Sequence, residues 1–232
     1  MFDPRLEAVY QAAAYLFASQ GYAATQVSQI AKRADIATGT VYNLFAGKKA
    51  ILHFVVLANL DPKAFEDGPT LPLQEMPDMA IKDKLAPIVE RLFHRLHALG
   101  DDGIPVLSFR QTLEELFDDV YRYNRAFSII NDNPEALPEA AGKYRSAVDS
   151  LYELLDRNLR LYMQAGQVRS IRYPHLHIRN IIEGITWWAI YLPLRLGFLD
   201  AWNREASELS PDEAKAIAVD VLCHAYLQDP SA

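Results

Sequence analysis

The sequence predicts an all-α protein in which a small N-terminal helical domain precedes a larger helical domain. Apolar residues recur at steps of three and four along almost the whole chain, and this spacing gives a helix one apolar face. No stretch alternates convincingly with period two, as a half-buried strand would. Of the 232 residues, 50% are hydrophobic, which is enough for one large core or for a small module and a larger domain.

The N-terminal part of the sequence predicts a series of short helices. A helix that begins near residue 6 ends at Gly21, since glycine is a common helix stop. Thr25 stands at the N-cap position of the next helix. Asp35 occupies a turn, where Asp tolerates a left-handed backbone better than most residues. A very short helix follows over 38–44, and another begins near Gly47.

The remaining sequence predicts a connector and several longer helices. Residues 61–80 are rich in proline and acidic residues and are predicted to be a loop. A capping box with proline at the first helical position, Ser210 to Glu213, marks the start of the last helix. About nine or ten helices are expected in all. The later ones are predicted over 84–99, within 107–130 as one or two helices, and over 143–164, 174–196 and 211–228.

Charge and cysteine content limit the class of protein. The formal net charge is -7, yet residues 1–57 hold five basic and three acidic side chains, which leaves -9 for the rest. A mildly basic N-terminal part followed by an acidic remainder is expected if only the N-terminal part contacts DNA. The one cysteine, Cys223, excludes a disulfide within the chain. Neither a signal peptide nor an apolar stretch long enough for a bilayer is evident, so we expect a cytoplasmic protein.

Residues 25–52 predict two short helices joined by a tight turn. Their small shared core would come from Ile30, Ala31, Ile36 and Val41. A helix-turn-helix of this kind presents the N-terminal residues of its second helix to base edges in the major groove of DNA.

The run from Thr38 to Phe45, followed by Lys48, resembles the signature of the TetR family of transcriptional regulators. In that signature, Gly-Thr/Ser-aliphatic-Tyr-x-x-Phe-x-x-Lys forms the recognition helix and the start of the next helix. The detailed resemblance covers residues 6–56, and the remainder agrees only in length and helical character. The chain departs from the usual family residues at four positions, which are Asp35, Ala37, Leu44 and Gly47.

The resemblance implies a DNA-binding domain over residues 1–50 and an effector-binding and dimerisation domain over 51–232. It implies phosphate contacts for Thr25, Tyr42 and Lys48. It also implies that one group of residues faces the bases, namely Thr38, Gly39, Thr40 and Asn43. Phe45 is expected in the core, and Tyr42 is expected to pack its ring and offer its hydroxyl to the DNA backbone.

Lys48 and Lys49 give an independent hint of bound phosphate. Both lie at a helix N-terminus, where the macrodipole disfavours a cation, and a bound phosphate would reverse that cost. The alternative is two solvated lysines. Asn43 can pair with adenine through two hydrogen bonds.

A homodimer is expected because one recognition helix reads only a few base pairs. By resemblance, the dimer forms through helices 174–196 and 211–228. The first of these is apolar on two faces, so one face would meet its own domain and the other a partner subunit. The alternative is a central helix buried wholly inside one subunit.

An effector pocket is expected among the middle helices. Its many aromatic residues favour a small, largely apolar or aromatic molecule, although aromatic residues at helical spacing are usually plain core. The candidate lining residues are Phe93, Phe109, Arg110, Phe117, Tyr121, Phe127, Tyr162 and Trp187.

The sequence therefore predicts a repressor that binds a palindromic operator as a dimer and is released by a small molecule, with no cofactor and no metal. Transcriptional activation, and an architectural DNA-binding module without an effector, are the alternatives within DNA binding. A helical metal-dependent enzyme is disfavoured because HExxH, ExxH and CxxC patterns are missing. A cysteine enzyme is disfavoured because Cys223 and His224 lack a third partner.

Overall fold

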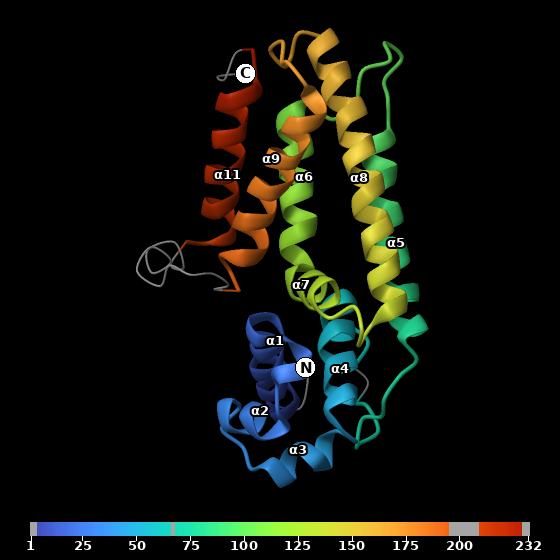
Figure 1. The fold of residues 1–232 in the computed structure, drawn as a ribbon, viewed down its shortest axis with the longest axis vertical. Helices are drawn as coiled ribbons and strands as arrows, with labels where there is room; N and C mark the ends of the chain where they lie inside the picture. The colour runs from blue at the N-terminus through green and yellow to red at the C-terminus, as the bar shows by residue number, and fades with distance from the viewer. Residues whose placement is uncertain (1–3, 66–67, 195–208, 229–232) are drawn as a thin grey trace. The chain divides into compact units, whose positions relative to one another are not determined.

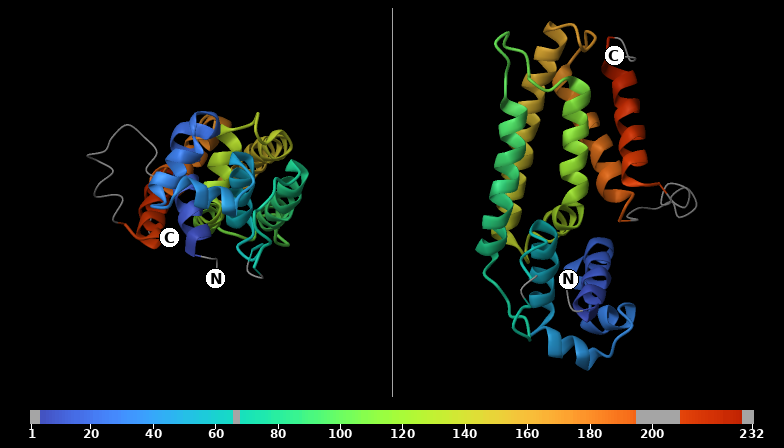
Figure 2. Two further views of the ribbon diagram at one scale, coloured as in Figure 1. Left: turned by 90° about the horizontal axis from the view of Figure 1, so that it is seen from below. Right: turned by 180° about the vertical axis from the view of Figure 1, so that it is seen from behind.

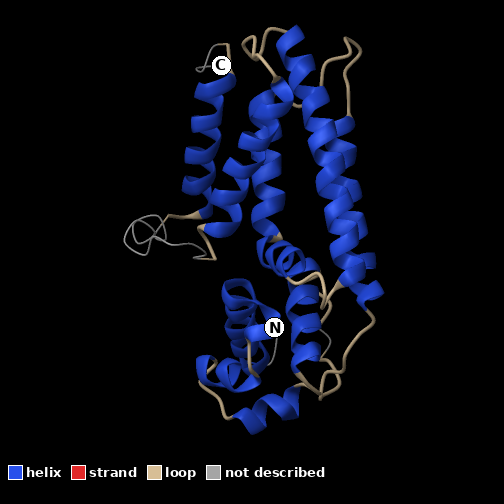
Figure 3. Cartoon of the chain, in the orientation of Figure 1, coloured by secondary structure: helices blue, strands red, loops and turns tan. Residues whose placement is uncertain are grey.

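The computed structural model describes residues 4–65, 68–194 and 209–228 (Figure 1). Over these residues the chain forms ten α-helices and one π-helical turn. Strand pairing within them is limited to isolated bridges, and Figure 3 shows helices and loops alone. The all-α class predicted from the sequence is confirmed.

The first four helices are α1 (Pro4–Ala24), α2 (Val27–Arg33), α3 (Thr38–Leu44) and α4 (Lys48–Leu60). The next four are α5 (Asp78–His97), α6 (Phe109–Arg122), α7 (Asn124–Asp132) and α8 (Pro138–Gln164). The described chain then forms α9 (Pro174–Thr186), the π-helical turn η1 (Trp187–Tyr191) and α11 (Pro211–Tyr226). None of these helices is long and apolar enough to cross a membrane.

Most predicted helix ends agree with the structure. Gly21 has φ 81° and interrupts α1, and Gly166 has φ 74° just after α8. The capping box before α11 is formed, because the backbone N–H of Glu213 donates to Ser210 Oγ (3.3 Å) and the backbone N–H of Ser210 donates to Glu213 Oε2 (2.8 Å). The predicted cap at Thr25 is wrong by one residue, since Gln26 is the N-cap of α2.

Two helices begin earlier than the sequence predicted. α5 starts at Asp78 and α8 at Pro138. The Asp78 carboxylate accepts hydrogen bonds from the backbone N–H groups of Glu139 (2.6 Å) and Ala140 (3.4 Å), in the first turn of α8. A helix start needs such acceptors. This one lies 61 residues away in the sequence, where no local pattern reveals it.

Contacts divide the chain into two compact units. The first comprises Met1–Pro87 and Tyr123–Arg145, and the second comprises Ile88–Arg122 and Ser146–Ala232. The first unit therefore holds α1 to α4, α7 and the starts of α5 and α8. The functional boundary after residue 50 remains a prediction, since α4 and α7 pack with α1 in the same unit.

The core of the first unit is built around α4, which is buried along almost its whole length. Phe54 lies at its centre and packs edge-on against Tyr10 (ring centroids 6.2 Å apart) and Phe65 (4.9 Å). Its ring also lies 5.2 Å from that of Phe45, which is fully buried. Phe45 therefore belongs to the core, as predicted.

His53 on α4 is buried and makes one hydrogen bond, in which the backbone N–H of Met76 donates to its Nδ1 (2.9 Å). Protonating Nδ1 would break that bond. Its Nε2 is buried without a hydrogen-bond partner among the described residues. Burial lowers the pKa of His53, and the positive charge of Lys49 lowers it further.

We expect the free energy of unfolding to decrease as the pH falls from 7 to 5. Below about pH 6.5 the unfolded chain binds a proton at His53 that the folded chain excludes, so protonation favours unfolding. His53→Gln keeps a hydrogen-bond acceptor and cannot titrate, so it should flatten this part of the profile. Urea denaturation at half-unit pH steps measures the effect. Equal pH dependence in the two proteins would contradict it.

The core of the second unit lies between α6, α8, α9 and α11. Figure 1 and the right-hand view of Figure 2 show α6 beside α9, and α11 contacts both of these helices. A Cβ added at Gly184 of α9 would lie 3.7 Å from Leu222 Cδ2 of α11, an ordinary van der Waals distance, so this contact between the two helices does not require glycine. Ion pairs at the surface join α6 to α11, from Arg110 to Asp220 (2.9 Å) and from Lys215 to Asp118 (3.0 Å).

Candidate nucleic-acid interface and interior cavity

The helix-turn-helix predicted over residues 25–52 is present. Asp35 has φ 54°, so the left-handed turn that the sequence predicted is confirmed. The turn is closed by the backbone N–H of Ile36, which donates to Ala31 O (3.1 Å). Ile30 and Ala31 on α2 are fully buried, as is Val41 on α3. The two helices are thus held together by the small core expected of this motif.

One face of α3 is left uncovered. Thr38, Gly39, Tyr42 and Asn43 are exposed and Thr40 is half-buried. Tyr42 is 53% exposed, so its ring is packed less than expected. Gly39 has open space around it, since a Cβ there would meet no atom of the chain within 4 Å. The fold itself does not require glycine at this position.

Leu44 lies on the buried face of α3, with 1% of its surface exposed. Family members commonly carry an aromatic residue or histidine here that touches a phosphate. Leu44 cannot make that contact, because it is both apolar and buried.

Thr25 does not lie on the exposed face with the other predicted contacts. Its side chain is 1% exposed, and its hydroxyl donates to Gly21 O (2.7 Å). A phosphate contact through this hydroxyl would require the bond to break and the side chain to emerge. The position of Thr25 therefore gives the predicted side-chain contact no support.

Lys48 is also engaged within the protein. Its ammonium donates to Tyr22 O (2.8 Å), Thr25 O (2.9 Å) and Ala23 O (3.4 Å). It also lies 4.3 Å from the centroid of the Tyr22 ring. An ammonium has three N–H donors, and each one here has a carbonyl partner. The sequence could not reveal this, because the partners come from a different helix.

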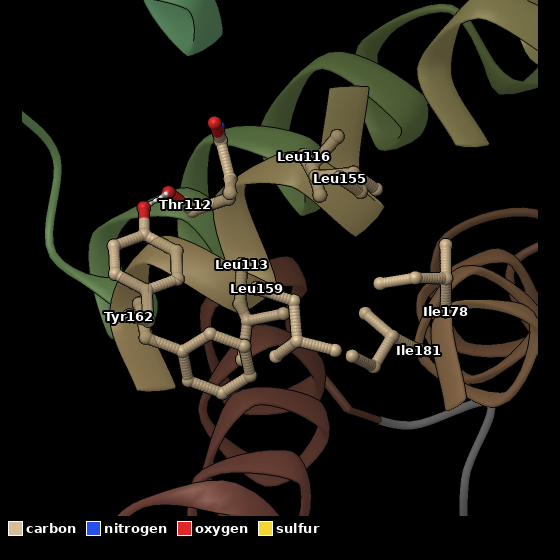
Figure 4. Close-up of a pocket in the computed structure, with 10 residues that line it drawn as sticks. Thr112, Leu113, Leu116, Leu155, Leu159, Tyr162, Ile178 and Ile181 are labelled. Atoms are coloured by element: carbon tan, nitrogen blue, oxygen red, sulfur yellow. Dashed lines mark hydrogen bonds between the residues drawn. The ribbon is translucent and has the colours of Figure 1, made fainter. Parts of the chain in front are cut away.

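The second unit contains a small interior cavity of about 10 Å³. Figure 4 shows aliphatic side chains from α6, α8 and α9 converging on it, with a polar pair at one end. Its lining residues are Phe109, Thr112, Leu113, Leu116, Leu155, Asn158, Leu159, Tyr162, Ile178 and Ile181.

Two of the predicted ligand residues, Phe109 and Tyr162, line this cavity. The aliphatic lining residues were not predicted, because aliphatic residues at helical spacing look like ordinary core in a sequence. The sequence does carry a signal at Asn158, since a polar residue on the apolar stripe of a helix needs a buried partner. Its Nδ2 donates to Leu96 O (2.8 Å).

The other predicted ligand residues lie elsewhere. Phe117 and Tyr121 stack on each other with centroids 5.8 Å apart, and Arg110 pairs with Asp220. Trp187 is 43% exposed. Phe93 lines an open groove of about 420 Å³ between α5 and α8. Phe127 belongs to the first unit, where it packs against Tyr123 and Tyr144.

The polar end of the cavity is a short hydrogen-bond chain. Tyr162 donates its hydroxyl proton to Leu107 O (2.7 Å), because a carbonyl can only accept. Thr112 must then be the donor to the Tyr162 oxygen, which lies 2.7 Å away. Burial raises the pKa of Tyr162, so the phenol stays protonated. Among the residues that the structure describes, no charged side chain lines the cavity.

No metal site emerges from the part of the chain that the structure describes. Within it, no three or more His, Cys, Asp or Glu side chains come together in a way that could hold a metal ion.

A helix-turn-helix with an exposed second helix defines the helix-turn-helix class of DNA-binding folds. Residues 9–55 match the family described as bacterial regulatory proteins, tetR family. This N-terminal segment of the chain belongs to the TetR family. The family consists of regulators rather than enzymes, in agreement with the class predicted from the sequence.

A curated relative is the HTH-type transcriptional regulator HbdR of Aromatoleum sp. (strain CIB), which is 34% identical over 117 residues. The match covers 48% of this chain and 46% of HbdR, so the chain spans about half the length of this relative.

Solved structures share the fold over almost the whole chain. KstR2, the ketosteroid transcriptional regulator of Mycobacterium tuberculosis, has a TM-score of 0.55 at 15% identity, covering 99% of this chain and 98% of KstR2. The probable transcriptional regulatory protein RHA5900 has a TM-score of 0.53 at 17% identity, covering 94% and 96%. At these identities the likeness concerns the fold alone.

Proposed function

We propose that the protein is a transcriptional repressor that binds a palindromic operator as a homodimer and is released by a small molecule. The observation that carries the proposal is the uncovered face of α3. Its residues Thr38 to Asn43 follow a formed helix-turn-helix turn and leave polar groups facing outward. Such a second helix fits the major groove of DNA.

The exposed residues of α3 suit base reading. Asn43 makes no hydrogen bond within the described residues, so its amide is available to adenine. The methyl groups of Thr38 and Thr40 can contact a thymine methyl. Gly39 is not needed for internal packing, and close approach of DNA to the backbone is a reason for its presence. The Tyr42 hydroxyl suits a phosphate.

The C-terminal helices support the proposed homodimer. In α9, Ile178, Ile181 and Ile185 are buried within the subunit. Five large apolar side chains of α9, η1 and α11 nevertheless remain exposed, and they are Leu176 (60%), Trp187 (43%), Tyr191 (43%), Ile217 (38%) and Val221 (61%). A partner subunit would remove them from water. Residues 195 and 196 of the predicted interface lie outside the described residues.

The interior cavity supports a neutral, largely apolar effector. Its lining is mostly aliphatic and aromatic, and a buried carboxylate would find no cation among the described lining residues. At about 10 Å³ the cavity holds roughly one water. An effector would therefore bind a state in which the helices around the cavity have moved apart. If that state does not match the operator, binding shifts the population toward release. We place this activity in the bacterial cytoplasm, where the operator is accessible.

Retention of sheared chromosomal DNA tests the proposed function. The purified protein should retain a small set of fragments at about 150 mM salt, in the presence of competitor DNA. Sequencing should show a shared inverted repeat among them. Retention without any shared sequence, or no retention at low salt either, would contradict the proposal.

Tyr162→Phe should lower the free energy of unfolding by about 1–2 kcal/mol, because it leaves Leu107 O and the Thr112 hydroxyl without their buried partner. Tyr173→Phe is the matched control, since Tyr173 is 53% exposed and its change should stay within about 0.5 kcal/mol. Urea denaturation of the three proteins measures both. Equal stabilities of the two variants would show that the hydroxyl chain contributes nothing.

A further inference from the structure

We infer that Lys48 positions the helix-turn-helix by holding the C-terminal end of α1, instead of contacting a DNA phosphate. The inference rests on the proposed DNA-binding function, because the helix-turn-helix is what Lys48 would position. It assigns this lysine a role opposite to the one that its place in the family signature suggests.

The first support is the hydrogen bonding of the ammonium. Three carbonyl oxygens, those of Tyr22, Ala23 and Thr25, lie 2.8, 3.4 and 2.9 Å from Lys48 Nζ. They belong to the last turn of α1 and to the residue that follows it. The carbonyl groups of a last helical turn have no partner inside their own helix. Lys48 donates to two of them, Tyr22 O and Ala23 O, and also to Thr25 O just after the helix. Tyr22 O accepts a second hydrogen bond, from the backbone N–H of Thr25 (3.3 Å).

The second support is the charge environment of the ammonium. Lys48 is the first residue of α4, and the positive end of that helix disfavours a cation. Its side chain reaches the carbonyl oxygens of Tyr22, Ala23 and Thr25, which follow the break of α1 at Gly21 and carry partial negative charge. The unfavourable position at the start of α4 is thus offset by these carbonyl contacts. No bound phosphate is needed to explain a lysine at this position.

The third support is that other side chains also form hydrogen bonds with the segment at the end of α1. Thr25 Oγ1 donates to Gly21 O (2.7 Å), and Gln20 Nε2 reaches Ala24 O (3.4 Å). Asn133, the C-cap residue after α7, accepts at its Oδ1 from the backbone N–H of Tyr22 (2.7 Å). Side chains from α4 and from the end of α7 therefore fix the segment that leads directly into α2. The direction in which α2 and α3 leave α1 depends on these bonds.

Lys49 provides a matched comparison. It lies one residue further along α4 and is half-buried like Lys48, and it makes no hydrogen bond or ion pair within the described residues. Lys48→Met and Lys49→Met remove the same charge from the same helical turn. They differ in that the first alone breaks the bonds to the end of α1.

The first measurement uses the free protein, so it stands even if the proposed function fails. Hydrogen exchange should become about tenfold faster, or more, at amides of residues 22–30 in Lys48→Met, while Lys49→Met should resemble the wild type. If Lys48→Met fails to fold while Lys49→Met folds, this result would also support the inference, since a phosphate contact contributes nothing to the stability of the free protein. Lys48→Gln, which keeps two N–H donors, would then serve for the next measurement.

The second measurement is the salt dependence of operator binding. Each lost phosphate contact lowers the slope of log K against log salt by about 0.9, hence by about 1.8 for a dimer. Lys48→Met should keep the wild-type slope and lose about tenfold or more in affinity at every salt concentration. A slope reduced by about 1.8 with unchanged hydrogen exchange would overturn the inference. A wild type that binds no DNA would refute the proposed function. The hydrogen-exchange result would then still decide whether Lys48 holds the end of α1.

Discussion

Asn43→Ala is expected to weaken binding to the selected operator by roughly 10² to 10³-fold, while binding to unrelated DNA stays almost unchanged. A bidentate contact between a side chain and a base contributes about 1–3 kcal/mol to discrimination, and a dimer loses it twice. Asn43 is exposed and makes no hydrogen bond within the described residues, so the fold loses nothing. Fluorescence anisotropy with operator and scrambled duplexes measures the two affinities.

Asn131→Ala is the control for this prediction. Asn131 is an exposed asparagine on α7, where its amide donates to Asp132 Oδ1 (2.8 Å), and it lies outside the helix-turn-helix. Its removal should change neither affinity. Equal losses of Asn43→Ala on operator and on scrambled DNA would assign Asn43 to the phosphates. No loss on either would remove it from the interface.

Val221→Arg is expected to convert the dimer to a monomer at micromolar concentration and to abolish operator binding. Val221 lies on α11 with 61% of its surface exposed in the single chain, and the exposed Ile217 is its neighbour one turn away. In a C2 dimer the substitution buries two charges near each other without partners, at a cost of several kcal/mol. A monomer presents one α3 and reads one half-site.

Val106→Arg makes the same exchange at another valine of the second unit. Val106 is 62% exposed and lies between α5 and α6, outside the proposed interface. Sedimentation equilibrium should find this variant dimeric and Val221→Arg monomeric. Two dimeric variants would place the subunit interface elsewhere. A monomeric wild type would refute the proposed dimer.

The helix-turn-helix could be predicted closely because its determinants are local. The apolar spacing of Ile30, Ala31 and Val41 and the turn chemistry of Asp35 lie within a few residues of one another. The limits of α3 and α4 also follow from nearby residues, and they agree with the structure within one residue. Local signals of this kind are the ones that a single sequence carries.

Positions that depend on distant partners could not be predicted. Lys48 looked like a phosphate ligand because its carbonyl partners lie more than twenty residues earlier, at the end of another helix. The start of α8 depends on Asp78, 61 residues away. The cavity is lined by aliphatic residues of three helices, which differ from ordinary core residues only through the way the helices pack.

Methylation interference on a bound chromosomal fragment shows whether α3 enters the major groove, because guanine N7 lies in that groove. We expect interference at two clusters of guanines with inverted sequence, about 10 to 10.5 base pairs apart or a multiple of this. Interference at a single cluster, or binding unaffected by major-groove methylation, would contradict a pair of α3 helices reading DNA.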